Sequence, residues 1–216
     1  MRIGIAGTGG IGLAMAADLS QRGHAIALWS PRGGTADVFR AAPLRATGLI
    51  EADCPLAVAT SAADLAAASD VVIIAVPVNG HRGVIEALAP HIRDGMTVIV
   101  SSTASLSALY LHERLNRRGC AATIAAFGTT VLTARRTGAG VAVLMRRQRL
   151  GVSALPAAQA GAVLALCTDL FGDVFGLDAN VLASTLVNIN PIAHGPLAIL
   201  NWTRIERGEA WPQYHY

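Results

Sequence analysis

Short apolar runs alternate with segments of helical periodicity over most of the chain. The runs are long enough for buried strands and cover residues 2–6, 24–29, 56–60, 70–76, 97–101 and 121–126. Apolar residues at helical spacing predict helices over 13–22, from 61 onward, over 79–91 and over 105–117. This alternation predicts a doubly wound α/β fold with a parallel sheet, whose ligands bind beyond the carboxyl ends of the strands.

The pattern changes after residue 126. Short strand-like runs cover 129–134, 140–145 and 150–154. The first two flank a hairpin-like turn, so the three runs predict an antiparallel extension of the sheet. A helix over 157–171 is expected to close this unit, and the earlier segment 33–55 looks irregular apart from a helical patch near 38–42.

A glycine pattern lies between the first expected strand and the first expected helix. Gly7 allows a tight turn, Gly9 leaves room for a diphosphate, and Gly12 lets helix and strand pack closely. The helix N-terminus then faces the anion. Because the context matches the dinucleotide-binding turn of a Rossmann fold, we expect the whole turn to bind cofactor: Gly7, Thr8, Gly9, Gly10, Ile11 and Gly12.

The end of the second expected strand bears on the choice between NAD and NADP. An acidic residue there would hydrogen-bond the adenosine ribose, but this chain has Ser30 and Arg32, which suit a 2′-phosphate. NADP is therefore favoured, with NAD left open because Arg32 could also simply decorate a turn. The same edge should bring Val76, Pro77, Ser101 and Ser102 to the cofactor, although residues 101–103 also suit a helix cap ahead of Ser105.

Composition narrows the classes of protein that fit. Apolar residues make up 53% and charged residues 14% of the chain, as in a globular protein with a large core. All 17 basic residues are Arg, so Lys chemistry is excluded, and the scattered Arg pairs do not predict nucleic-acid binding. Three widely spaced cysteines favour reduced thiols rather than disulfides or a metal site. With no apolar stretch of about 20 residues, we expect a soluble cytoplasmic protein that makes no use of a membrane.

A polar stripe marks the C-terminal segment, which becomes helical from Asp178, a residue type that suits an N-cap. Asn190, His194 and Asn201 share one face of an otherwise apolar helix, which Pro191 and Pro196 should kink or restart. His194 suits acid–base catalysis, since histidine titrates near neutral pH. The alternatives are a hydrogen-bonded core histidine, and an Asn190–Pro191 pair that only caps the helix.

Residues 188–206, with Tyr214 and Tyr216 after them, resemble the start of the helical domain of the octopine/nopaline (opine) dehydrogenase family. The stretch 127–135 and the strands that follow resemble that family's sheet extension. The resemblance implies a reductase that joins an α-keto acid to the amino group of an amino acid with NAD(P)H. It also implies that His194 is the catalytic proton donor and acceptor, and that substrate contacts come from Asn190, Asn201, Thr129 and Arg135.

The same resemblance divides the chain into a dinucleotide-binding domain, 1–176, and the first part of an all-helical substrate domain, 177–216, expected to be incomplete. Apolar surface left exposed by a short helical domain could be covered in a homodimer. Two alternatives stay open. One is a relative of ketopantoate reductase or the β-hydroxyacid dehydrogenases, which typically use a Lys that this chain lacks, and the other is a non-catalytic NAD(P)-binding module.

Overall fold

A central eight-stranded sheet forms the body of the protein. The structure, a computed structural model, describes residues 1–187 and 190–210. The strand order is β12-β11-β8-β7-β6-β1-β2-β5. The strands are β1 (Arg2–Ala6), β2 (Ala25–Trp29), β5 (Ala57–Val58), β6 (Val71–Ile74), β7 (Thr97–Ser101), β8 (Thr123–Phe127), β11 (Leu150–Leu155) and β12 (Phe175–Leu177). All neighbours pair in parallel except β8 and β11, which confirms the doubly wound sheet and one antiparallel addition to it.

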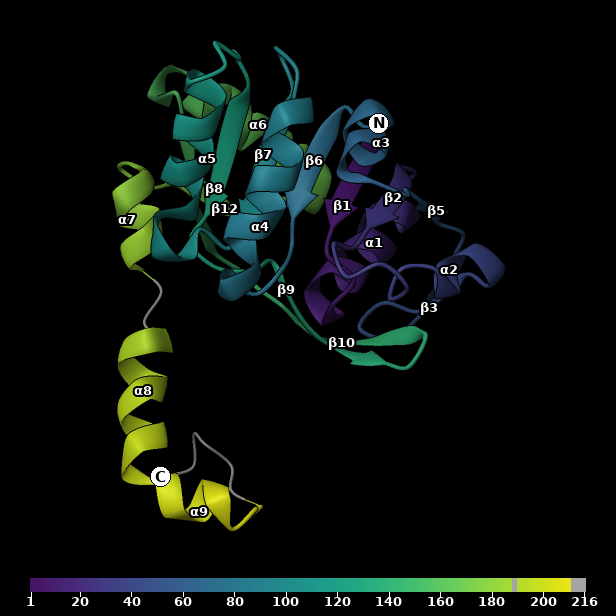
Figure 1. The fold of residues 1–216 in the computed structure, drawn as a ribbon, viewed down its shortest axis with the longest axis vertical. Helices are drawn as coiled ribbons and strands as arrows, with labels where there is room; N and C mark the ends of the chain where they lie inside the picture. The colour runs from purple at the N-terminus through teal and green to yellow at the C-terminus, as the bar shows by residue number, and fades with distance from the viewer. Residues whose placement is uncertain (188–189, 211–216) are drawn as a thin grey trace.

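Helices cover both faces of this sheet (Figure 1). α1 (Gly10–Gln21) and α6 (Ala160–Phe171) pack on the face that carries Ile3 and Ile5. The other face, which carries Val72 and Ile74, is covered by α3 (Ala62–Ala67), α4 (Val78–Leu88) and α5 (Ser107–Asn116). Short 3-10 turns follow α4 and precede α5 and α6, at Ala89–His91, Ala104–Leu106 and Ala157–Gln159.

A second, four-stranded sheet corrects two expectations. Its order is β4-β3-β10-β9, with β3 (Leu44–Gly48), β4 (Ala52–Cys54), β9 (Leu132–Thr137) and β10 (Gly140–Arg146). The expected hairpin exists as β9–β10, but it extends this separate sheet rather than the central one. The segment 33–55 is not irregular either: besides the helix α2 (Val38–Ala41), it supplies β3, which pairs in parallel with β10, and β4.

The position of α1 explains why the second sheet forms. Residues 12–19 of this helix are all buried, and apart from Asp18 none of them is charged or polar, so its apolar surface is not confined to one stripe. Its inner side packs on the central sheet, and its remaining apolar surface meets Leu132, Val141 and Val143 of the second sheet. The helix is thus enclosed between two sheets.

The C-terminal segment differs from expectation in its caps. α7 (Val181–Leu186) is capped by Asn180, whose Oδ1 accepts from the N–H groups of Leu182 and Ala183 at 3.0 Å each. Asp178 is therefore not the N-cap, because the chain is still leaving β12 at that point, and its carboxylate instead accepts from the Ser184 hydroxyl at 2.6 Å. α8 (Asn190–Leu200) runs through Pro196, and α9 (Trp202–Glu206) follows. Both extend away from the layered body (Figure 1).

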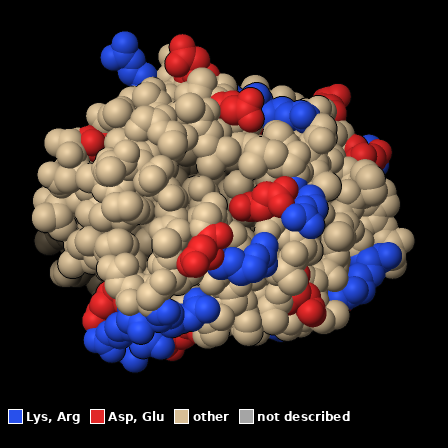
Figure 2. Space-filling view, turned by 90° about the horizontal axis from the view of Figure 1, so that it is seen from above, with Lys and Arg blue, Asp and Glu red and all other residues tan. Residues whose placement is uncertain are grey.

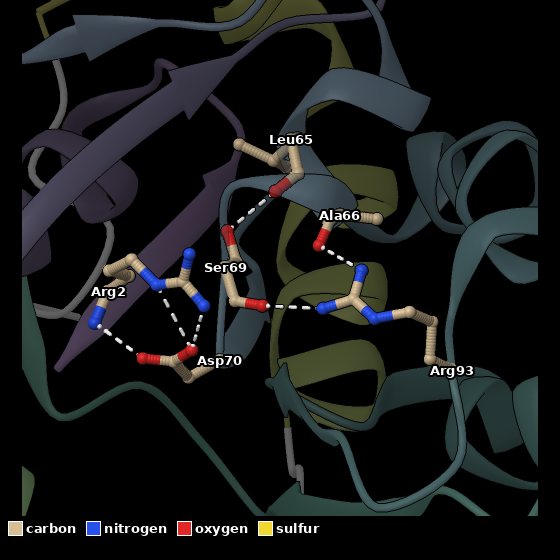
Figure 3. A network of polar contacts seen from close by, with 6 residues as sticks. All are labelled: Arg2, Leu65, Ala66, Ser69, Asp70 and Arg93. Carbon is tan, nitrogen blue, oxygen red and sulfur yellow. Dashed lines mark hydrogen bonds and ion pairs between the residues drawn. The ribbon is translucent and has the colours of Figure 1, made fainter.

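A polar network fixes the amino ends of β1 and β6, opposite the edge where ligands are expected (Figure 3). The Asp70 carboxylate accepts from the Arg2 backbone N–H at 3.0 Å and from its Nε at 3.1 Å, which lowers the pKa of Asp70 to about 2. Arg93 donates to the carbonyls of Ala66 and Ser69, at 2.8 and 3.1 Å. The network ties the turn after α3 to β1 and to the segment that precedes β7.

Side chains of opposite charge lie beside one another on the face seen in Figure 2. Ion pairs along helices include Arg82 with Glu86 and Arg117 with Glu113. Among the helices in the described ranges, none is both long and apolar enough to cross a membrane.

Candidate active site

A cavity of about 510 Å³, here called the central cavity, opens at the carboxyl ends of β1, β6 and β7. Its walls come from the glycine turn, the segments after β6 and β7, the β8–β9 loop, α7 and α8. The lining residues that the sequence predicted are Gly9, Gly10, Ile11, Val76, Pro77, Ser101, Ser102 and His194. The fold thus brings expected cofactor residues and the expected catalytic histidine to one space.

A second cavity of about 310 Å³, the lateral cavity, lies beside it. It contains the expected ribose-site residues Ser30 and Arg32, together with Gly7 and Thr8 of the turn. Gly9, Val76 and Pro77 line both cavities, so the two adjoin at the glycine turn. An elongated ligand could lie across the turn with one end in each cavity.

A side chain at each of the three motif glycines would meet a different environment. Gly7 has φ +133°, and a Cβ there would lie 2.2 Å from the Ala75 carbonyl oxygen. A Cβ on Gly12 would lie 2.2 Å from the Gly7 oxygen, so only glycine allows α1 to begin so close to β1. A Cβ on Gly9 would meet nothing within 4 Å, because it would project into open space at the junction of the cavities. This geometry fits a diphosphate held against the start of α1.

Arg136, on β9, reaches the glycine turn from the second sheet and was not expected there from the sequence. Its guanidinium donates to the carbonyl oxygens of Thr8 at 2.9 Å, Thr35 at 3.2 Å and Gly138 at 2.9 Å. Arg136 and Arg32 both line the lateral cavity, and no acidic residue of the described part of the chain does. No local sequence signal marks Arg136, because its role depends on a hairpin folding back over residues 8 and 35.

Hydroxyl groups form a chain along the same cavity. Thr8 Oγ1 lies 2.9 Å from Thr35 Oγ1, which donates to Ser30 Oγ at 2.8 Å. Thr35 was not expected from the sequence. This row of hydrogen-bonded hydroxyl groups joins the glycine turn to the end of β2, where folds of this kind bind the adenosine ribose.

His194 is half-buried on α8 and lines the central cavity. Thr130 and Thr185 line it too, and α7 is fixed on β11 by Ser184, which hydrogen-bonds Ser153 at 2.7 Å and Asp178 at 2.6 Å. These buried contacts hold α7, and with it Thr185, at the edge of the cavity.

The expected substrate residues are not all gathered there. Thr129 is half-buried next to Thr130 and does not itself line the cavity, and Arg135 is exposed, with its Cα 3.2 Å from the Cβ position of Gly10. The Asn201 side-chain amide donates to the Leu197 carbonyl at 3.0 Å. The side chain of Asn190 lies outside the described residues.

His81, on α4, is a second histidine of the central cavity, and no chemistry was expected of it from the sequence. Its Nε2 lies 3.0 Å from the Val76 carbonyl oxygen, and burial lowers the pKa of the imidazole. Neither its Nδ1 nor the buried Ser101 Oγ has a hydrogen-bond partner within the described ranges. No sequence signal marked this residue, because a polar side chain four residues after Pro77 also suits the exposed side of a helix.

The helix-cap alternative for the residues after β7 is partly realised. The Thr103 hydroxyl accepts from the Ala108 N–H at 3.3 Å, while Ser101 and Ser102 line the cavity.

All three cysteines are free thiols, and burial raises the pKa of Cys167 to about 12. No group of three His, Cys, Asp or Glu that could hold a metal ion is found in the described part of the chain.

Comparison with known proteins agrees with this architecture. A family model described as the NAD binding domain of 6-phosphogluconate dehydrogenase matches residues 2–145. An opine dehydrogenase from Arthrobacter sp. (strain 1C) is 27% identical over 220 residues, which cover 97% of this chain and 60% of the relative. A glycerol-3-phosphate dehydrogenase [NAD(P)+] from Halorhodospira halophila (strain DSM 244 / SL1) is 37% identical over 116 residues, or 51% of this chain and 34% of that protein.

Solved structures show the same fold at lower sequence identity. Octopine dehydrogenase with NADH and L-arginine superposes with a TM-score of 0.79 at 18% identity, over 98% of this chain and 56% of that one. A putative ketopantoate reductase from Ralstonia solanacearum MolK2 gives 0.68 at 22% identity, over 98% and 71%. The chain spans about 60% of the length of the opine dehydrogenase that it matches. Since the family model covers two thirds of its residues, including the whole glycine turn, the chain belongs to the family of NAD-binding domains typified by 6-phosphogluconate dehydrogenase.

Proposed function

We propose that the protein is an NAD(P)H-dependent oxidoreductase of the opine dehydrogenase type, which condenses an α-keto acid reductively with the amino group of an amino acid. The observation that carries the proposal is the position of His194, which lines the same cavity as the glycine turn and the Ser101–Ser102 segment. The opine dehydrogenase relative, which aligns along nearly the whole chain, supports it.

The chemistry divides between the cofactor and the protein. In the proposed reaction amine and keto acid lose water to give an imine, whose carbon would be reduced by hydride from NAD(P)H held at the glycine turn. The imine nitrogen takes up a proton, which gives a secondary amine with two carboxylates. We assign the donation of that proton to His194, because an imidazole ring can both donate and accept a proton and His194 lines the cavity that the glycine turn also lines.

The protein's other contribution is orientation of the two substrates. Thr130 and Thr185 line the central cavity, and their hydroxyl groups are candidates to bind a substrate carboxylate. The Thr185 hydroxyl donates to the Val181 carbonyl at 2.9 Å and would have to leave it to donate to substrate. Contacts of Asn190, Asn201, Thr129 and Arg135 with substrate remain predictions. Asn201 would have to turn its amide away from Leu197 to make one.

We further propose that residues 177–216 begin the helical substrate domain. α7, α8 and α9 carry exposed apolar side chains that include Leu186, Ile192, Leu200 and Trp202. A homodimer is one arrangement that would cover them, and light scattering of the purified protein tests it: a monomeric mass at working concentration excludes that arrangement.

For the cofactor we propose NADP in preference to NAD. Arg32 and Arg136 place two positive charges on the lateral cavity, where an acid that would bind a ribose 2′-hydroxyl is missing from the described lining. Titration of NADPH and NADH, followed by cofactor fluorescence, is expected to show tighter binding of NADPH. Arg32→Ala should weaken NADPH and leave NADH unchanged, and equal affinity of the wild type for both cofactors would refute the preference.

The reaction is tested by oxidation of NADPH in the full-length protein, with pyruvate or 2-oxoglutarate screened against an amino-acid panel. Turnover that needs both substrates supports reductive condensation. Turnover with a keto acid alone would instead favour the ketopantoate-reductase type of reaction, and cofactor binding without turnover for any pair would favour a non-catalytic module.

His194→Asn separates catalysis from structure. We expect it to lose turnover and keep cofactor affinity, whereas His91→Asn, at an exposed position after α4, serves as a matched control with normal turnover. If His194→Asn keeps its turnover, or if it unfolds the protein, the assignment of His194 as proton donor is lost.

A further inference from the structure

His81 is held in one protonation state and one tautomer by its surroundings. The side chain is 4% exposed, and its Nε2 lies 3.0 Å from the Val76 carbonyl oxygen. A carbonyl can only accept, so Nε2 carries the hydrogen and Nδ1 presents a lone pair. Burial lowers the pKa of the ring, which keeps Nδ1 free of a proton at neutral pH. His81 is therefore a buried acceptor at the wall of the central cavity.

Ser101 supplies the complementary group. It ends β7, is 3% exposed, and lines the same cavity as His81. Its hydroxyl, like the Nδ1 of His81, has no hydrogen-bond partner within residues 1–187 and 190–210. Buried polar atoms are nearly always paired in folded proteins, so two such atoms, on residues that line one cavity, point to a ligand that pairs with both. That ligand must offer a donor to His81 and an acceptor to Ser101.

A primary carboxamide offers both. We propose that His81 and Ser101 together bind the carboxamide of the nicotinamide ring: the amide N–H donates to His81 Nδ1, and the Ser101 hydroxyl donates to the amide oxygen. The proposal rests on the placement of the dinucleotide given above, with its adenosine end in the lateral cavity, and does not depend on the identity of the substrate. It makes the two residues positioning groups that fix the rotation of the ring beside His194.

The arrangement of His81 and Ser101 also discriminates between dinucleotides with different substituents on the pyridine ring. A carboxylate at the same place has no N–H to give, and it would oppose the His81 lone pair. His81 and Ser101, here called the carboxamide clamp, therefore select the amide form of the dinucleotide over the nicotinic acid form. They also select it over the 3-acetylpyridine analogue, which keeps the carbonyl and replaces the amino group by a methyl group.

His81 borders another space as well. A cavity of about 450 Å³ between α4 and α5 shares His81, Val78, Ala104 and Ser105 with the central cavity, and Ser107 lines it with a second unpartnered hydroxyl in the described part of the chain. A ligand in that cavity would also use His81 Nδ1. Ser107 and Ser101 thus distinguish the two placements, because each lines only one of the two cavities.

The test is a titration of the protein with NADH and with reduced 3-acetylpyridine adenine dinucleotide, followed by cofactor fluorescence. We expect wild type to bind NADH about 3- to 10-fold more tightly, the effect of one hydrogen bond. His81→Phe should bind the two cofactors equally, by losing affinity for NADH alone. His81→Gln should restore the preference, because its amide can donate to Val76 and accept from the ring substituent.

Ser101→Ala gives the second signature. Both cofactors keep the carbonyl that Ser101 serves, so both should bind more weakly by a similar factor while their ratio stays at the wild-type value. Ser107→Ala is the matched control and should change neither affinity nor ratio.

Equal binding of the two cofactors by wild type, or an unchanged preference in folded His81→Phe, would overturn the proposal. A loss of preference in Ser107→Ala would also overturn it, because it would place the ligand between α4 and α5. If His81→Phe does not fold, the wild-type ratio and the Ser101→Ala variant still decide the matter. Because the readout is binding, a protein that shows the preference but no turnover would refute the proposed reaction and leave the clamp intact.

Discussion

Replacing two glycines of the same turn by alanine should have opposite consequences. In Gly12→Ala the new Cβ would lie 2.2 Å from the Gly7 carbonyl oxygen, so α1 must move by about 1 Å against β1. Eight consecutive residues of α1 are buried between two sheets, which leaves little room for that shift. Overpacking of this kind costs about 1–3 kcal/mol, or a fall in Tm of roughly 2–12 °C for a chain of this size.

Gly9→Ala should leave stability nearly unchanged. Its backbone has φ −77° and ψ 177°, which alanine adopts readily, and its Cβ would meet no atom within 4 Å. The loss of a good N-cap residue and the smaller entropy of the unfolded chain oppose each other within about 1 kcal/mol. The methyl group would instead project where the two cavities join, so cofactor affinity should fall by about 10-fold or more if a diphosphate lies there.

Thermal melts and NADPH titrations of both variants check these expectations. The expected pattern is a destabilised Gly12→Ala and a stable Gly9→Ala that binds cofactor poorly. A stable Gly9→Ala with wild-type affinity would show that the cofactor does not cross the turn at Gly9. Equal loss of Tm in both variants would show that the open space at Gly9 is not available to a side chain.

Three further outcomes follow from single contacts. Arg136→Met removes the hydrogen bonds to the carbonyls of Thr8 and Thr35, so NADPH affinity should fall about 10-fold. Arg136→Lys should not restore the affinity, because an ammonium group cannot span both carbonyls. A titration that gives wild-type affinity in either variant would contradict this expectation. Asp70→Asn should make the free energy of unfolding depend less on pH in the acid range. The folded-state pKa of about 2 lies below the ordinary 3.8, so the carboxylate stabilises the fold above that range, and this stabilisation is lost as the pH falls through it. Urea melts of wild type and variant across that range would show the difference. Phe127→Ala should cost about 3–5 kcal/mol in urea melts, because this fully buried ring packs against Phe171 and Phe175, and a cost below 1 kcal/mol would mean that the core collapses around the gap.

The central sheet could be predicted because its signals are local. The run at 97–101 coincides with β7, and the run at 2–6 with β1. Each strand is short, apolar and buried on both faces, so its own sequence identifies it without knowledge of its neighbours. At 56–60 the same reasoning overestimated the element, which shrinks to the two residues of β5 at the edge of the sheet.

The second sheet could not be predicted from local pattern, because its strands depend on a distant partner. β3 is only half-buried in alternation and acquires its parallel partner from residues 140–143, nearly a hundred positions later. One signal was present in α1. The stretch Leu13-Ala-Met-Ala-Ala leaves no polar side, and a helix apolar all around indicates burial between two layers.

The site divides in the same way. The glycine turn and the ends of β6 and β7 follow from motif and topology, since parallel strands deliver their carboxyl ends to one edge. The contacts of His81 and Arg136 do not follow from motif or topology, because they depend on where one side chain points in the folded protein. A histidine four residues after Pro77 looks like a surface residue of an amphipathic helix until its ring is seen bonded to Val76 and sealed from water.

The β9–β10 hairpin connects the glycine turn to the wall of the central cavity. Its backbone packs on Gly10, where a Cβ would lie 2.6 Å from the Ala134 oxygen, and its Arg136 holds the carbonyls of Thr8 and Thr35. The loop that leads into the same hairpin carries Thr130 to the wall of the central cavity. Any shift of the glycine turn on cofactor binding must therefore be transmitted to Thr130 through one short, well-packed strand. A hydrogen-exchange experiment should show β9 amides protected by NADPH together with those of the turn, and protection confined to the turn would mean that the two sides of the site move independently.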